Sequence, residues 1–176
     1  NSRPIIGLWY TVWWTKDDQF KHWINCQRFP TRGHYTSGDP SVISDHYKQF
    51  RDLGIDFLIM DDTNGVGADS GKINDHIRAW FDFMDRLPEK EIIPICIGGG
   101  GEMRAEGRAG QQRASDIYHR LWAQRTSYFQ LEGKPLLLVD TDHNYGPGDF
   151  DDKRFTVRWV YNGNNYEFMA RRQTWG

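Results

Sequence analysis

Four acidic side chains stand where apolar stretches of this chain end. Ligands bind at the carboxyl ends of parallel strands, and these ends meet at one rim of a sheet, so we expect the four carboxylates to lie near one another. Two carboxyl groups on one rim can serve as general acid and general base. The predicted catalytic residues are Asp61, Asp62, Glu102 and Asp140.

Aromatic and polar side chains accompany these carboxylates. Trp13 and Trp14 end the first apolar run, in a chain with 15% aromatic residues and eight tryptophans. Their flat faces are surfaces on which sugar rings could pack; the alternative is that both pack in the core or in a loop. The residues predicted to bind a substrate are Tyr10, Trp13, Trp14, Asn64, Asp142 and His143.

Structural explanations compete with these roles. Adjacent residues of an extended strand point to opposite faces, so only one of Asp61 and Asp62 is expected to face a site. The alternative is that one caps the following loop while the other is solvated. The glycine after Asp140–Asn144 comes one position too late for a calcium loop, and turn chemistry is the default there. A metal-dependent hydrolase using Asp61, Asp140 and His143 stays an alternative, but no metal or cofactor is predicted.

The glycine run, the two cysteines and the helix histidines give little further information about function. The four glycines at 98–101 let backbone approach a ligand before Glu102, or they mark a mobile loop. They are followed by no Gly-Lys-Ser/Thr, so they do not form a P-loop, and no dinucleotide fingerprint follows the first strand. Cys26 and Cys96 could pair or remain free thiols. The histidines His46, His76 and His119 fall within predicted helices and are expected to be packed or exposed helix residues rather than ligands.

Apolar runs alternate with stretches of helical periodicity. Apolar residues at i, i+4 and i+7 predict three helices, the first with Asp39 at its N-cap and Pro40 at its first position. A long loop is predicted over residues 13–38, and such loops are uncommon unless they serve a site or a partner. Strands are predicted at 4–12, 55–60, 91–97, 134–139 and 154–161, and helices at about 40–53, 73–87 and 111–129.

This order of elements predicts an α/β fold with a parallel sheet and right-handed crossovers. It gives a single domain over residues 1–176 with four to five βα units. A complete eight-fold barrel takes about 250 residues. We therefore expect either an open sheet or a partial (β/α)8 (TIM) barrel, the N-terminal part of a longer one.

Charge and hydropathy exclude several partners. The formal net charge is -2, which gives no electrostatic reason to expect nucleic acid or an anionic membrane surface as a partner. No apolar run approaches the roughly 20 residues that span a bilayer, and the first residues are not typical of a signal peptide.

Several short motifs together resemble a known family. In their order and spacing they are similar to the N-terminal half of the (β/α)8 glycoside hydrolases of families 71 and 99, the endo-α-mannosidase and endo-mannanase group. The similarity spans about residues 5–159. The motifs are Gly-Leu-Trp-Tyr-Thr-Val-Trp-Trp at 7–14, His34-Tyr35-Thr36-Ser37, Asp39-Pro40-Ser41-Val42-Ile43, His46, Gly54-Ile55-Asp56-Phe57, Tyr128-Phe129 and Gly133-Lys134-Pro135-Leu136-Leu137.

This resemblance implies a secreted or periplasmic barrel that cleaves a glycan or polysaccharide, mannan-like in its chemistry. The family's essential glutamates lie on later strands, so no catalytic pair is carried over. The positions that match are Tyr10, Trp13 and Trp14 after the first strand and the Asp61–Asp62 site after the second, where relatives tend to be aromatic.

Glycoside hydrolysis would require two carboxyl groups about 5–5.5 Å apart for retention, or about 6.5–9.5 Å apart for inversion. The predicted function is a glycoside hydrolase with paired carboxylates, and the alternative is a non-catalytic carbohydrate-binding module. The expected partners are a carbohydrate substrate and either the second half of the barrel or another copy of the chain.

Overall fold

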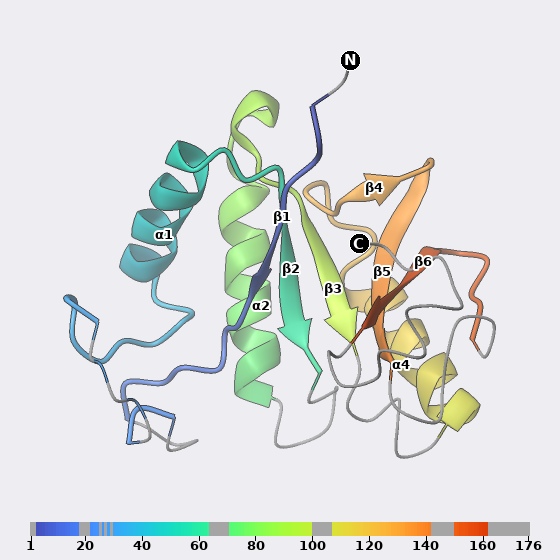
Figure 1. Cartoon of the computed structure of the whole chain (residues 1–176), viewed down its shortest axis with the longest axis horizontal. Helices are drawn as coiled ribbons and strands as arrows, with labels where there is room; N and C mark the ends of the chain where they lie inside the picture. The colour runs from blue at the N-terminus through green and yellow to red at the C-terminus, as the bar shows by residue number, and fades with distance from the viewer. Residues whose placement is uncertain are drawn as a thin grey trace.

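The computed structural model describes residues 3–17, 22–24, 26, 28, 30–63, 71–99, 107–141 and 150–161. Strands and helices alternate through these ranges as the sequence predicts (Figure 1). The elements are β1 (Gly7–Tyr10), α1 (Pro40–Asp52), β2 (Phe57–Asp62), α2 (Gly71–Met84), the 3-10 helix η2 (Glu89–Glu91), β3 (Ile95–Gly99), α4 (Gly107–Leu121), β4 (Gln130–Leu131), β5 (Lys134–Thr141) and β6 (Thr156–Tyr161).

One sheet organises the described chain. Strands β1, β2, β3, β5 and β6 are parallel neighbours in that order, and the short β4 pairs antiparallel with the start of β5. The β4–β5 hairpin turns through Glu132 and Gly133, both at positive φ, which is the backbone that a tight two-residue hairpin requires. The parallel order of β1, β2, β3, β5 and β6 confirms the predicted parallel βα repeats.

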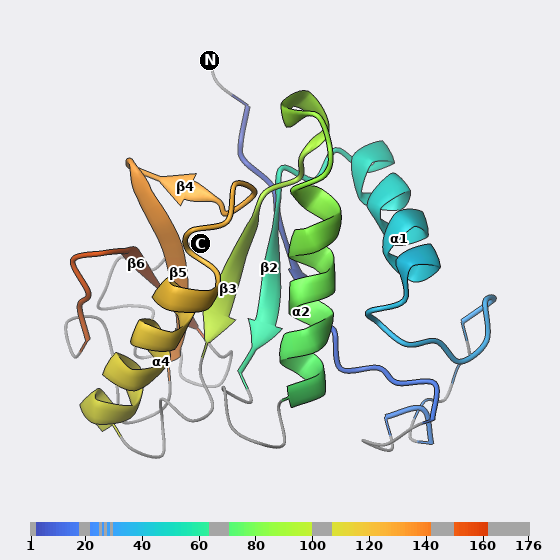
Figure 2. The ribbon, with the colours of Figure 1, turned by 180° about the vertical axis from the view of Figure 1, so that it is seen from behind.

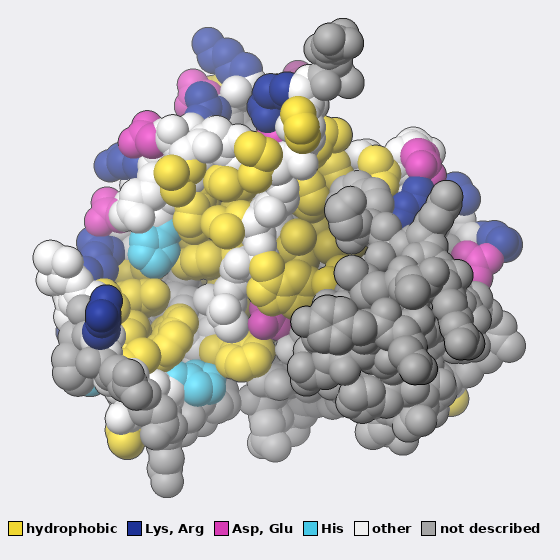
Figure 3. Space-filling model, viewed as in Figure 1, with side chains coloured by type: hydrophobic (Ala, Val, Ile, Leu, Met, Phe, Trp, Pro, Cys, Tyr) yellow, Lys and Arg dark blue, Asp and Glu magenta, His cyan; other side chains and the backbone are white. Residues whose placement is uncertain are grey.

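Helices α2 and α4 cover one face of the sheet, and α1 lies beside α2 near the β1 edge (Figure 2). We call the opposite face, turned toward the viewer in Figure 1, the front face. Hydrophobic side chains gather there over the strands (Figure 3). Trp9 and Ile59 lie on this face beside Gly98, where an added Cβ would come within 2.5 Å of the Trp9 ring.

The core lies between the sheet and the helices. Its largest fully buried side chains include Trp80 and Phe81 of α2, and Trp122 just after α4. Phe81 stacks on both Trp122 and Tyr128, with ring centroids 5.4 and 5.9 Å apart. The apolar stripe predicted for α2 is thus the stripe that packs on the strands.

Several predicted boundaries are wrong. Strand β2 continues through Asp62 rather than ending at Met60, so both carboxylates are strand residues. Helix α4 ends at Leu121 rather than near Phe129, because Tyr128 forms a bridge with Ile95 and Phe129 stacks on Phe57, with ring centroids 4.4 Å apart. The apolar spacing in 122–129 arises from packing against α2 and the sheet and not from a continuing helix.

Two further expectations at element ends also need correction. Residues 91–94 precede β3 instead of opening it: Glu91 ends η2, and Pro94 contributes only its carbonyl, which accepts a hydrogen bond from Leu58. Pro94 has no N–H to donate, which explains why the ladder begins after it. Asp39 stands at the N-cap of α1, but its side chain makes no capping hydrogen bond.

Candidate functional site at the carboxyl end of β2

The two adjacent carboxylates at the end of β2 have different surroundings. In the sheet register Asp61 is paired with Gly98, and this position lies on the front face. Asp62 is on the opposite, helix-covered face by strand alternation, and it is completely buried. Its carbonyl accepts a hydrogen bond from the hydroxyl of Tyr118, 3.4 Å away. Asp61, at 6% exposure, is therefore the carboxylate of the pair that faces the front.

The loop that follows β1 holds Asp61 in place. The indole N–H of Trp13 donates to the Asp61 carbonyl, 3.3 Å away. The Oδ1 atom of Asp61 accepts hydrogen bonds from the Thr63 backbone N–H (3.1 Å) and hydroxyl (2.7 Å), which forms a turn at the strand end. Within the described part of the chain, Oδ2 has no such partner and remains an acceptor. Trp13 and Asp61 thus meet at this strand end, through the indole N–H and the Asp61 backbone carbonyl.

Tyr10 faces the helices rather than Asp61. Its hydroxyl lies 2.7 Å from Nδ1 of His46, and its ring packs edge-on against Phe50 and Trp80. Burial raises the pKa of the Tyr10 hydroxyl and lowers that of His46. Trp9, which sequence reasoning did not single out, lies on the front face instead. Adjacent residues of β1 point to opposite faces of the sheet, and this alternation distinguishes Trp9 from Tyr10.

Trp14 belongs to an aromatic cluster within the loop. Its ring centroid lies 4.3 Å from that of Trp23, which stacks on His34 at 5.0 Å and meets Tyr35 edge-on. A backbone hydrogen bond also joins the two parts of this loop, since the N–H of Ser37 donates to the carbonyl of Trp14 over 2.9 Å. This cluster fixes the loop from which Trp13 extends.

A cavity of about 400 Å³ lies beside this loop, at the start of α2. We call it the rim cavity. It is lined by loop residues and by three residues from the first two turns of α2, Lys72, Asp75 and His76. His76 is 7% exposed, and its Nδ1 lies 2.7 Å from the carbonyl of Val12, which must accept the hydrogen bond. Gly38 packs against the ring, where an added Cβ would lie 2.6 Å from Cδ2 of His76.

Several predicted site residues are not described structurally. The backbone of Asp140 forms part of β5, paired with Val160, but its side chain lies outside the described part of the structure. Asn64, Glu102, Asp142 and His143 also lie outside it. Asp61 and Trp13 are therefore the predicted residues that the structure brings together.

Among the described residues, no group of three or more His, Cys, Asp and Glu side chains is arranged to hold a metal ion. The described thiols of Cys26 and Cys96 are both free. Burial raises the pKa of the Cys96 thiol, so this group is unreactive as a nucleophile. None of the described helices combines the length and the apolar character needed to cross a membrane.

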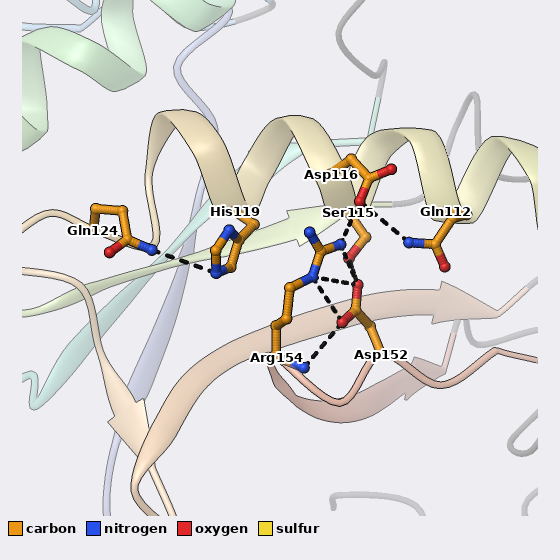
Figure 4. A network of polar contacts seen from close by, with 7 residues as sticks. All are labelled: Gln112, Ser115, Asp116, His119, Gln124, Asp152 and Arg154. Carbon is orange, nitrogen blue, oxygen red and sulfur yellow. Dashed lines mark hydrogen bonds and ion pairs between the residues drawn. The ribbon is translucent and has the colours of Figure 1, made fainter.

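Another buried carboxylate, Asp152, joins α4 to the segment before β6 (Figure 4). Its Oδ2 accepts from the Ser115 hydroxyl at 2.5 Å and from Nη2 of Arg154 at 2.6 Å, and Oδ1 accepts from the Arg154 backbone. Arg154 also reaches Asp116 on α4. The hydrogen bonds from Arg154 and Ser115 hold the pKa of Asp152 well below its usual value. Every strong donor here comes from the protein itself, which is the arrangement of a structural ion pair.

Comparisons with known proteins identify the fold. No family model and no curated protein sequence matches the chain. The solved structures that it resembles include the GH99 endo-α-mannosidase from Bacteroides thetaiotaomicron in complex with bis-tris propane, with a TM-score of 0.61 and 16% identity, covering 77% of this chain and 41% of that one. Another structure of that endo-α-mannosidase gives a TM-score of 0.60 at 15% identity, covering 77% of this chain and 44% of that one.

A third solved structure, described as a glycoside hydrolase-like protein, gives a TM-score of 0.59 at 17% identity and covers 79% of this chain and 42% of the other. The chain thus spans about two fifths of the length of the structures that it matches. With the parallel order of its strands, this likeness shows a partial (β/α)8 fold similar to that of glycoside hydrolases. The resemblance that the motifs predicted is confirmed at the level of the fold.

Proposed function

We propose that this chain forms the substrate-facing first part of a glycoside hydrolase that acts on an α-mannoside or a mannan-like glycan. The observation that carries the proposal is the meeting of Asp61 and Trp13 at the carboxyl end of β2. Substrates of (β/α)8 enzymes bind at this end of the strands. The structures that share the fold include endo-α-mannosidases, which supports the substrate class.

The hydrogen bonds of Asp61 support the proposal that it contacts substrate. Oδ1 is held by two donors from Thr63, so the carboxylate has a fixed orientation before any ligand binds. Oδ2 is left to accept a hydrogen bond from a sugar hydroxyl or to take part in proton transfer. The half-buried ring of Trp13, whose N–H bonds to the Asp61 carbonyl, is the proposed surface for a sugar ring.

The other elements of the proposal follow from the resemblance. The protein acts outside the cytoplasm, in a secreted or periplasmic setting, and the remaining βα units or a second copy of the chain complete the barrel. Asp140 and Glu102 are the proposed carboxylates to pair with Asp61 across the rim.

The test is hydrolysis of α-mannan and α-mannooligosaccharides by the full-length protein. Asp61→Asn is expected to lower kcat/KM by about 100-fold, the lower end of the contribution of one acid or base residue. The matched control is Asp56→Asn, just before β2, where the carboxylate bonds to Arg3 and to the N–H of Ile6. Equal activities of Asp61→Asn and the wild type would contradict the proposal.

A second candidate function, a non-catalytic carbohydrate-binding module, is favoured by one detail. Oδ1 of Asp61 already accepts two hydrogen bonds, which suits a positioning residue as well as a reacting one. In that case the full-length protein binds mannooligosaccharides without releasing products, and Asp61→Asn weakens binding only.

A further inference from the structure

The rim cavity lies on the other side of the β1 loop from Asp61. Two consecutive loop residues connect the two places: the carbonyl of Val12 receives the hydrogen bond from His76, and the indole of Trp13 donates to Asp61. The backbone N–H of Lys16 donates to the Thr36 hydroxyl over 2.9 Å, which fixes the loop wall of the cavity. Its volume falls in the range of small-molecule sites, about 300–1,000 Å³.

His76 is the group in this cavity whose chemistry is most defined. A carbonyl oxygen can only accept, so Nδ1 carries the hydrogen and Nε2 of the neutral ring is an acceptor. Among the described residues, nothing donates to Nε2, although the side chain is more than nine-tenths buried and lines the cavity. A ligand that bonds to Nε2 of the neutral ring therefore offers a hydrogen-bond donor.

Three of the charged residues that line the cavity have ion-pair partners, whereas Lys16 is exposed and forms no ion pair within the described residues. Nζ of Lys72 lies 3.3 Å from Oδ2 of Asp17, and Arg78 holds Asp75 at 2.5 Å. An anion would have to compete with these carboxylates for the Lys72 ammonium and would face the lone pair of His76. A neutral polyhydroxylated ligand fits better, because its hydroxyls can donate to Nε2 and to carboxylate oxygens.

The geometry points to a second sugar-binding position in the rim cavity, in which Nε2 of His76 accepts a hydrogen bond from a hydroxyl of a neutral sugar unit. This inference rests on the proposed function and extends it. The glycan bound at Asp61 and Trp13 continues past the β1 loop, and its next unit occupies the cavity. Carboxylates in ion pairs, such as Asp75, provide acceptors for neighbouring hydroxyls.

The test uses the full-length protein with isotope-labelled histidine rings, titrated with mannobiose or with inorganic phosphate. Mannobiose is expected to shift the ring signals of His76, and phosphate to leave them unchanged. In His76→Asn, the side-chain NH2 keeps a donor near the Val12 carbonyl, and no atom stands in the place of Nε2. Mannobiose affinity should fall about five- to tenfold in this variant, the effect of one hydrogen bond.

The matched control is His46→Asn. His46 also bonds through Nδ1, to Tyr10, but lines a different cavity beside α1, so its replacement should leave affinity unchanged. Lys72→Met changes a half-exposed wall residue without touching the core and should weaken mannobiose binding too. Unshifted His76 signals, unchanged affinity in His76→Asn, or phosphate bound at His76 would each overturn the inference.

Hydrolysis measured on the same samples separates this inference from the proposed function. Hydrolysis that depends on Asp61 with no response of His76 to mannobiose contradicts only the second sugar position. A response of His76 without hydrolysis supports the second sugar position and contradicts the proposed hydrolase activity.

Discussion

Two buried aspartates in this molecule illustrate two uses of a carboxylate. Asp152 is surrounded by donors of its own chain, including the guanidinium of Arg154 and the hydroxyl of Ser115. Asp61 is bonded to Thr63 on one oxygen, and in the described part of the chain no Lys or Arg pairs with it. A carboxylate whose charge is neutralised serves the fold, whereas one that keeps an open oxygen at a strand end can serve a ligand.

Their positions in the fold agree with this distinction. Asp152 lies 5% exposed between α4 and the segment before β6, where it links a helix to the sheet. Asp61 occupies the front face at the carboxyl end of β2, next to the ring of Trp13. Removing the charge of Asp61 should therefore affect activity, whereas removing the charge of Asp152 should affect stability.

The largest expected effect is on catalysis. Asp61→Asn should lower kcat/KM for an α-mannooligosaccharide by about 100-fold in the full-length protein. The free energy of unfolding should change by less than about 1 kcal/mol, because an amide oxygen can still accept from Thr63. Steady-state kinetics and urea unfolding measure both quantities. A large loss of stability with normal kinetics would assign Asp61 to the structural class of Asp152.

The next effect is on stability. Asp152→Asn should lower the free energy of unfolding by roughly 2–3 kcal/mol, because it removes the counter-charge of Arg154 within a largely buried network. Activity under conditions where the variant is folded should match the wild type. Asp151→Asn, one position earlier in an exposed pair with Lys153, is the matched control and should leave the unfolding midpoint unchanged.

A smaller effect concerns the stability of the folded chain at acidic pH. The pKa of Asp152 is lowered in the folded state, so the unfolded chain takes up the proton first as the pH falls. The stabilisation is complete above the ordinary aspartate value of about 4 and is lost progressively below it. Unfolding measured between pH 7 and pH 3 should show a steeper loss for the wild type than for Asp152→Asn. Parallel curves would show that the Arg154 pair does not carry this dependence.

The smallest expected effect separates the two properties of Trp13. Trp13→Phe keeps a flat ring but removes the N–H that donates to the Asp61 carbonyl. Losing one hydrogen bond at a partly exposed site should raise KM about threefold with kcat little changed. Trp13→Ala, which removes the ring as well, should have a larger effect on KM. Identical KM values for the two variants would mean that no sugar packs on the ring.

The sequence was sufficient for the strand–helix order because each apolar run is bounded by strong local signals. Pro40 opens α1, and Gly54, at a φ of 72°, follows its end. The sequence was not sufficient where tertiary contacts override the spacing of apolar residues. The apolar residues from Trp122 to Phe129 have helical periodicity, yet Tyr128 lies beside β3 and donates its hydroxyl to the Leu136 carbonyl. Nothing local to that segment announces a pairing with a distant strand.

The candidate site was predictable in part for the same reason. The apolar run before Asp61 identifies a strand and hence its carboxyl end, and alternation assigns the two aspartates to opposite faces. The same rule, applied to β1, would have placed Trp9 and not Tyr10 on the front face. The contact of His76 with the Val12 carbonyl was not predictable, because it joins residues 64 positions apart.

The most direct test of the role of Asp61 is a structure of the full-length Asp61→Asn variant with a bound α-mannooligosaccharide. We predict a sugar ring against Trp13, with a hydroxyl or the glycosidic oxygen about 3 Å from the side chain at position 61. A sugar bound elsewhere on the molecule, with position 61 far from any of its atoms, would contradict that role.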